Sequence, residues 1–396
     1  MTDLKTRAAP GRPGALRRAA PALLGFAAVR ALGLVALALW SAARDKSAYS
    51  LLTARWDSLW YSRVAAGGYG HEVRLPNGDV HSDLAFFPLL PWLERLGAAV
   101  SPLSHADAGF MVSLLASLAA AWGIFAVGDQ VYGRRAGICL VLLWAVLPVG
   151  IVQSMAYSES LFTALAAWSL YAVGTGRWVT AGALALAAGL TRPVGLAVAA
   201  AVWAAGVAAF VRTRGPAAAH GAPASARAPG EGARCAFGML LAPLGAAGYV
   251  LWVGHRTGGG PFGYLDVQAG WRNGFDGGWA FARFTAEKFT SFPSALAGAG
   301  LVLGVALVVW LYVTGVRRRL PLPLLVYTGT VTALALCASG YFGSKPRLLL
   351  PAFPLLLPLA AALARTRTAR SAAVVAGIAV ASALYGAFWL NGSGPP

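Results

Sequence analysis

Long apolar runs, separated by short polar segments, dominate the pattern of residues along this chain. Most of these runs are close to the ~20 residues that a helix needs to cross a ~30 Å hydrocarbon core. The pattern therefore predicts an all-α, polytopic integral membrane protein with eleven transmembrane helices. The predicted spans are 20–43, 106–128, 136–153, 158–174, 178–190, 193–211, 236–254, 294–315, 321–340, 348–364 and 371–390.

Composition supports the same class of protein. Hydrophobic residues make up 58% of the chain and charged residues 12%, and the mean hydropathy is +0.64. Soluble domains carry about 25% charged residues, so the composition excludes a soluble protein. The formal net charge of +18 does not indicate a nucleic-acid partner, because no soluble domain interleaves basic with aromatic residues.

The distribution of charge predicts an orientation, because Lys and Arg collect in the cytoplasmic loops of membrane proteins. With the N-terminus in the cytoplasm, the cytoplasmic segments hold 18 of the 32 Lys and Arg residues but 3 of the 14 acidic residues. These segments are 1–19, 129–135, 175–177, 212–235, 316–319 and 365–370. We therefore expect a multi-pass protein of the cell membrane whose basic loops face an anionic inner leaflet.

The chain divides into a tail and one membrane domain. Residues 1–19, rich in Arg, Ala, Pro and Gly, are expected to form a disordered cytosolic tail, and 20–396 a single transmembrane domain. Its expected loops are a first outer loop at 44–105, a low-complexity cytosolic loop at 212–235 and an aromatic outer loop at 255–293. Among the spans, Arg30 is the candidate for a deeply placed charge.

The first outer loop combines aromatic residues with carboxylates. An apolar residue recurs every four positions, which predicts an amphipathic helix at the membrane surface. The positions are Leu52, Trp56, Trp60 and Val64. Asp57 lies beside this stripe and close to Arg55. A partly desolvated carboxylate is a better proton acceptor, so Asp57 is a candidate general base, although a helix cap or an ion pair with Arg55 would explain it equally well.

The predicted orientation gathers most chemically capable side chains on the outer side. They are Asp57, Asp83, Glu159, Arg192, Lys345 and Arg347. An active site on the outer face would explain this clustering. The alternative explanation is that the outer loops are long and therefore hold polar residues whether or not they form a site. Lys345 and Arg347 could instead only anchor the chain to lipid headgroups, without a role in the chemistry.

Cysteine and histidine show no pattern typical of a metal site. Cys139, Cys235 and Cys337 are widely spaced in or beside apolar spans, as small core residues are. The five His residues lack the spacing of known zinc motifs, and the chain has no D-x-D. We expect no cofactor; the alternatives are a metal at His71 or His81, or a divalent ion held by the outer acidic residues.

Several ordered elements of the chain resemble those of a known family. They are 55–61 (RWDSLWY), 64–65 (VA), 68–69 (GY) and 85–91 (AFFPLLP), followed more weakly by 156–162 (AYSESLF), 191–195 (TRPVG) and 345–347 (KPR). The set is similar to the PIG-V-type mannosyltransferases of the GT-C glycosyltransferase superfamily. The composition, rich in Ala, Arg and Gly, suggests a bacterial member, which leaves the acceptor open.

The resemblance implies a GT-C-like bundle and the transfer of a sugar, mannose in that family, on the outer face. The donor would be a sugar on a polyprenyl phosphate, and the acceptor a lipid, glycan or protein. Asp57 would act as the general base of an inverting displacement, while Arg192, Lys345 and Arg347 would stabilise the leaving phosphate. The other candidate substrate-binding residues are Arg55, Trp56, Trp60, Tyr61, Tyr69, Asp83 and Glu159.

Two other classes of function remain as alternatives. A secondary transporter, or a flippase for lipids or polyprenyl carriers, would use broken helices such as the one predicted near Arg192. However, the ionisable residues collect at helix ends and not at the bilayer centre, where transport pathways place theirs. A structural membrane scaffold would not require the acidic, aromatic loop at all.

Overall fold

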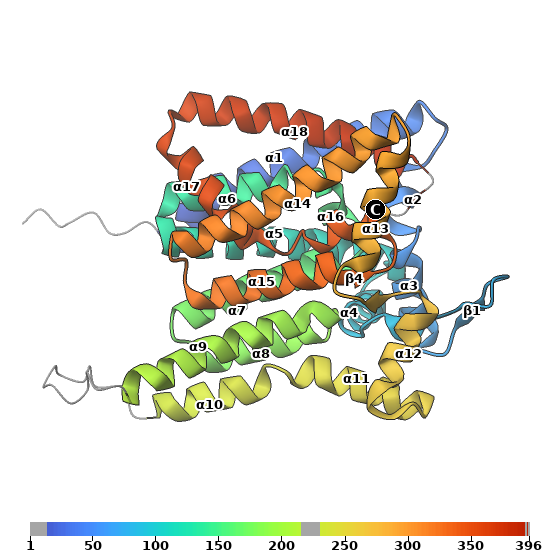
Figure 1. Cartoon of the computed structure of the whole chain (residues 1–396), viewed down its shortest axis with the longest axis horizontal. Helices are drawn as coiled ribbons and strands as arrows, with labels where there is room; N and C mark the ends of the chain where they lie inside the picture. The colour runs from blue at the N-terminus through green and yellow to red at the C-terminus, as the bar shows by residue number, and fades with distance from the viewer. Residues whose placement is uncertain (1–13, 215–229, 393, 395–396) are drawn as a thin grey trace, which may run out of the picture.

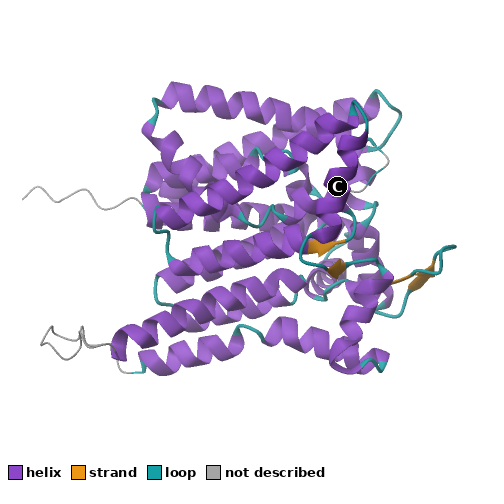
Figure 2. Cartoon of the chain, in the orientation of Figure 1, coloured by secondary structure: helices purple, strands orange, loops and turns teal. Residues whose placement is uncertain are grey.

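The computed structural model describes residues 14–214, 230–392 and 394, and it confirms an all-α membrane protein. Among these described residues, helices make up nearly all of the regular structure, and the strands form only two short antiparallel pairs (Figure 2). The first helix begins at Ala15, inside the predicted tail 1–19, and the predicted cytosolic loop 212–235 is bounded by helices ending at Arg214 and starting at Glu231. Most of both segments, 1–13 and 215–229, lies outside the described residues.

The helices are α1 (Ala15–Ala42), α2 (Ala48–Thr53), α3 (Asp57–Gly67), α4 (Leu89–Val100), α5 (His105–Tyr132), α6 (Arg134–Ala145), α7 (Ser158–Gly174), α8 (Trp178–Gly189), α9 (Leu196–Arg214), α10 (Glu231–Leu241), α11 (Leu244–Thr257), α12 (Gly263–Gly270), α13 (Trp279–Glu287), α14 (Ser294–Arg317), α15 (Leu322–Cys337), α16 (Lys345–Leu348), α17 (Leu357–Arg365) and α18 (Thr368–Leu390). The strands are β1 (Glu72–Arg74), β2 (Val80–Ser82), β3 (Gly274–Phe275) and β4 (Ala338–Ser339). Strand β1 pairs with β2 and β3 with β4, and the second pair joins the segment before α13 to the end of α15.

The predicted count of eleven spans is not confirmed. Six helices in the described part of the chain are long and apolar enough to cross a membrane, and a seventh span results if two helices joined by a 73° bend are counted together. Each predicted range contains helix, but several helices are short or broken. Proline is the main cause, because it removes a backbone donor and clashes with the preceding turn: α6 ends shortly before Pro148, and Pro351 and Pro354 fall at the bend.

The helices run roughly side by side between two different ends (Figure 1). One end carries α2, α3, α4, α12, α13 and the β1–β2 hairpin, whereas the other carries the start of α1 and the connection from α14 to α15. At this second end, Arg18 of α1 makes an ion pair of 2.8 Å with Asp129 of α5. Arg134 donates to the carbonyl of Arg18, and Arg135 to that of Thr366. Basic segments that are distant in the sequence therefore meet at one end of the bundle.

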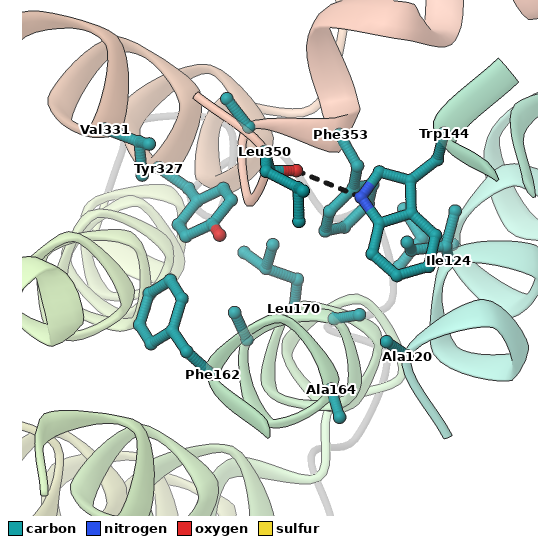
Figure 3. Close-up of a cluster of buried hydrophobic side chains, with 14 of the residues drawn as sticks. Ala120, Ile124, Trp144, Phe162, Ala164, Leu170, Tyr327, Val331, Leu350 and Phe353 are labelled. Carbon is teal, nitrogen blue, oxygen red and sulfur yellow. Dashed lines mark hydrogen bonds between the residues drawn. The ribbon is translucent and has the colours of Figure 1, made fainter. Parts of the chain in front are cut away.

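Buried hydrogen bonds hold the irregular backbone between α16 and α17. The indole of Trp144 donates to the carbonyl of Leu350 over 3.0 Å (Figure 3), and the hydroxyl of Tyr327 donates to the carbonyl of Pro351 over 2.9 Å. Backbone groups at membrane depth need such internal partners, because the hydrocarbon core supplies none. These two bonds fix the segment that carries Arg347.

Arg30 serves the same purpose at another break. Its guanidinium is buried in the middle of α1 and donates to the carbonyls of Ala145, at the end of α6, and of Gly150. The deeply placed charge predicted from the sequence is therefore a side chain that donates to backbone carbonyls at the point where α6 ends.

We expect Trp144→Phe to lower the free energy of unfolding by about 1–3 kcal/mol, since it leaves the buried carbonyl of Leu350 without a donor. Denaturant unfolding in mixed lipid and detergent micelles measures this change. The control is Trp310→Phe on α14, where the indole is largely exposed and no hydrogen bond is lost. A loss as large in the control would contradict the role given to the Trp144 bond.

Candidate functional site

Asp57 is the first residue of α3, directly after a break in the helix. The sequence predicted one continuous amphipathic helix through this region, and that prediction was wrong at positions 54–56. The hydroxyl of Ser58 accepts from the amide of Arg55 over 3.0 Å and donates to its carbonyl over 2.7 Å. Such local side-chain bonds compete with helix formation. Trp56 adopts a positive φ of 50°, which turns the chain so that Asp57 begins a new helix.

Arg347 connects Asp57 to a second, buried carboxylate. Its Nη2 lies 2.8 Å from Oδ2 of Asp57, and its Nε lies 3.1 Å from Oε1 of Glu159. Arg192 also makes an ion pair with Glu159. The side chains of Glu159, Arg347, Arg192 and Asp57 are 1%, 11%, 14% and 27% exposed. The four form an alternating row of charges that is buried at Glu159 and accessible at Asp57.

Four segments that are distant in the sequence supply this row. Asp57 and Glu159 lie in the first turns of α3 and α7, where helix dipoles favour a negative charge. Arg192 follows the end of α8 and precedes Pro193, which prevents the helix from continuing. Arg347 lies on α16, whose end is held by the Trp144 and Tyr327 bonds. The structure thus brings together four of the predicted site residues.

Two further contacts surround the row. The guanidinium of Arg347 lies 5.1 Å from the ring centre of Tyr157, a cation–π distance. The hydroxyls of Tyr61 and Ser158 are 2.8 Å apart, and burial raises the pKa of the Tyr61 hydroxyl, so this group stays neutral. Sequence reasoning did not single out Tyr157 or Ser158, although both belong to the AYSESLF element that it noted.

An aromatic cluster lies beside Asp57, one turn along α3. Trp60 is stacked on Phe86 at 5.6 Å and makes an edge contact with Trp271 at 5.0 Å. Trp271 is also stacked on His81 at 4.0 Å. The second predicted outer loop, 255–293, therefore packs on the first. Trp279, on the same loop, is 72% exposed and takes no part in this cluster.

Asp83 and Tyr69 hold the shape of the first loop. The carboxylate of Asp83 is fully buried and accepts from the amide of Gly70 at 3.0 Å and that of His71 at 2.9 Å. The hydroxyl of Tyr69 donates to the carbonyl of Phe86 over 2.8 Å. These bonds keep the Phe86 ring against Trp60.

Arg55, Trp56 and Lys345 lie at the margin of the site. The guanidinium of Arg55 lies 4.0 Å from the ring centre of Trp56 and donates to the carbonyl of Leu390. The ammonium of Lys345 donates to three carbonyls at the end of α15, with distances of 2.8, 3.2 and 2.8 Å. An ammonium has three donors, so Lys345 is fully used in this conformation.

No group of three or more His, Cys, Asp or Glu residues with the geometry of a metal site occurs in the described part of the chain. Asp57 and Glu159 are instead joined by Arg347. His71 lies within 3.2 Å of an Arg63 nitrogen, and His81 stacks on Trp271.

No protein-family model and no curated protein matches this chain. Among solved structures, ArnT from Cupriavidus metallidurans bound to undecaprenyl phosphate is similar, with a TM-score of 0.52, 16% identity and coverage of 90% of this chain and 62% of that one. The apo state of this ArnT gives a TM-score of 0.50 at 17% identity, over 87% and 60% of the two chains. A weaker match is the archaeal oligosaccharyltransferase AglB from Archaeoglobus fulgidus, with a TM-score of 0.46 at 11% identity over 94% and 56%.

The chain thus spans 62% of the length of the ArnT structure that it matches, and the likeness covers nearly the whole of the present bundle. At this level of identity the similarity concerns the fold. Together with the apolar helices, it shows that this chain is a multi-pass, all-α membrane protein with a GT-C-like bundle.

Proposed function

We propose that this protein is a membrane glycosyltransferase that transfers a sugar from a polyprenyl-phosphate-linked donor to a hydroxyl group. The observation that carries the proposal is the partly exposed Asp57 carboxylate, which Arg347 holds at the start of α3. It lies next to a cluster of aromatic rings of the kind that bind sugars, in a GT-C-like bundle. The ArnT structure that shares this fold contains undecaprenyl phosphate, which supports the same class of donor.

The proposed reaction is a single displacement at the anomeric carbon. The acceptor oxygen attacks C1 of the sugar while the bond from C1 to the phosphate oxygen breaks, so the configuration inverts. The electron pair of that bond leaves with the polyprenyl phosphate, and Asp57 takes the proton of the acceptor hydroxyl. Arg347 binds Oδ2 of Asp57, which leaves Oδ1 for the acceptor hydroxyl.

The leaving phosphate needs charge stabilisation and no proton. Arg192 is partly exposed, and Nη1 of Arg347 has no hydrogen-bond partner in the described part of the chain. Arginine suits this task because its planar group binds two phosphate oxygens at once. We assign the phosphate to these two residues; Lys345 would join them only after releasing the carbonyls of α15.

The finer features of the proposal rest on the sequence. The PIG-V-like elements at 55–61 and 85–91 favour mannose as the sugar. The basic segments gathered at the opposite end favour a cytoplasmic N-terminus and a site on the outer face of the membrane. Trp60, which is partly exposed, would stack on a sugar ring of the donor or of a glycolipid, glycan or protein acceptor.

A transfer assay in lipid tests the proposal directly. The purified protein is incubated with labelled mannosyl polyprenyl phosphate and a glycolipid extract, and products are separated and their anomeric configuration determined. Transfer with inversion supports the proposed reaction. Movement of intact lipid-linked sugar across the bilayer without transfer would instead support a flippase, and transfer with retention would contradict the single displacement.

We expect transfer to continue at an unchanged rate in the presence of EDTA. The proposed mechanism uses arginine to stabilise the phosphate, and the carboxylates of Asp57 and Glu159 are already paired with Arg347. Initial rates with EDTA and with added Mg²⁺ or Mn²⁺ measure this. A loss with EDTA that one of these ions restores would show that a divalent metal takes part.

A further inference from the structure

A cavity lies at the end of the bundle away from Asp57. It has a volume of about 530 Å³, which falls in the range of ~300–1,000 Å³ typical of ligand pockets. The ends of α5 and α7 and the connection from α14 to α15 line it. In Figure 1 this connection lies at the end opposite to α2 and α3.

The lining separates polar from apolar groups. Arg318 and Arg319 are exposed and line the cavity together with Gln130, while Val131 and Leu324 contribute an aliphatic wall. No acidic residue is among the lining residues of this cavity, which all lie in the described part of the chain. The cavity therefore joins two positive charges to an apolar surface.

The guanidinium groups of Arg318 and Arg319 have no ion pair or side-chain hydrogen bond in the described residues. The nearby acid Asp129 is already paired with Arg18. Two neighbouring arginines without a partner are well suited to a phosphate group, whose oxygens accept their donors bidentately. The free donors thus point to an anionic ligand.

The backbone at Arg319 supports a role for its side chain. Helix α14 ends with the amide of Leu320 bonded to the carbonyl of Gly315 and that of Arg319 bonded to Val316, the pattern of a Schellman cap. Arg319 occupies the left-handed position of this cap with a φ of 54°. Glycine is the usual residue there because a Cβ makes this conformation unfavourable. An arginine at this position lowers stability relative to glycine, and the cap would form equally well with glycine. The side chain of Arg319 is therefore retained for a reason other than the cap.

We propose that this cavity binds an anionic phospholipid, with Arg318 and Arg319 on its phosphate and the aliphatic wall on its acyl chains. The cavity lies at the end of the membrane helices, where headgroups lie, and combines an apolar wall with a cationic rim. A free phosphate would bind the two arginines but would make no contact with the aliphatic wall, so the lining favours a lipid. This site is separate from the proposed transfer reaction and does not depend on it.

Photolabelling of the full-length protein tests the proposal. The protein is placed in phosphatidylcholine nanodiscs that contain a small fraction of phosphatidylglycerol with a photoreactive group near the start of one acyl chain. Labelled peptides are mapped by mass spectrometry, and labelling of 127–132 and 318–324 is normalised to labelling of α18. We expect these two segments to be labelled preferentially. Added unlabelled phosphatidylglycerol is expected to reduce this labelling, whereas added phosphatidylcholine is expected to leave it unchanged.

The key variant is Arg318→Gln/Arg319→Gly, which removes both charges and places the favoured residue in the cap. The matched control, Arg317→Gln/Arg365→Gln, removes two charges from the same end outside the cavity. We expect the normalised labelling of the first variant to be lower than that of the control by a factor of about ten or more, because two charge-assisted contacts are lost. Equal labelling in both variants would overturn the proposal.

Two further arms complete the experiment. Val131→Phe fills the apolar part while keeping both arginines, and it is expected to lose the labelling as well; unchanged labelling would contradict insertion of the acyl chain. Inorganic phosphate, at the concentration of phosphatidylglycerol that competes, is expected to have no effect. Equal competition by inorganic phosphate would assign the cavity to a free anion and overturn the assignment to a lipid.

Discussion

Asp57→Asn is expected to lower the rate of sugar transfer by about 10²- to 10⁴-fold, the usual contribution of a general base. The amide has the shape of the carboxylate, but it cannot accept the proton of the acceptor hydroxyl. Donor binding is expected to change little, because Arg192 and Arg347 remain. The measurement is the initial rate of transfer in lipid at saturating donor, together with the donor concentration that gives half of this rate.

Asp45→Asn provides a matched control for the Asp57 variant. Asp45 is exposed, lies at the start of the same loop and has a positive φ of 51°, a conformation that asparagine tolerates well. The same chemical change is therefore made near the site without touching the row of charges. Wild-type rates in both variants would remove Asp57 from the mechanism. Equal losses in both would show that the loop is sensitive to charge in general, and no special role for Asp57 would remain.

The sequence predicted the class of protein well because hydropathy is a local property. Each predicted span contains helix, but the count of eleven is not confirmed, because prolines such as Pro148 and Pro351 break helices short of membrane length. Neighbouring helices and indole donors compensate for such breaks, as Trp144 does, and a hydropathy pattern does not contain these tertiary contacts.

The contacts within the candidate site could not be predicted from the sequence either. Charge placement and motif resemblance identified Asp57, Glu159, Arg192 and Arg347, which the structure brings together. They did not reveal that Arg347 bridges the two carboxylates, because this contact depends on the packing of α3, α7 and α16. The break before Asp57 was also missed, since it depends on the hydroxyl of Ser58 and not on an apolar period.

Arg347 has a dual role in this arrangement, in stability and in charge balance. It is buried between Asp57 and Glu159, and Glu159 itself is 1% exposed. Ion pairs in such surroundings are costly to break, because the remaining charge stays buried without its partner. The contribution of Arg347 to transfer can therefore be interpreted only when its contribution to folding is known.

We expect Arg347→Gln to lower the free energy of unfolding by about 3–5 kcal/mol, the range for breaking a buried ion pair. The double variant Glu159→Gln/Arg347→Gln is expected to recover part of this loss, since it removes the carboxylate that the first change leaves underpaired. Denaturant unfolding in mixed micelles gives both values.

A surface ion pair provides the control for the Arg347→Gln experiment. Arg272 and Asp79 lie 2.5 Å apart, but Arg272 is 68% exposed, so Arg272→Gln is expected to cost about 0–1 kcal/mol. If Arg347→Gln costs no more than Arg272→Gln, water reaches the row of charges freely. The site would then be an open, hydrated cleft, and the leaving phosphate would gain little from Arg347. A large loss that the double variant partly restores would instead support a dry site in which two arginines act on the phosphate with little screening.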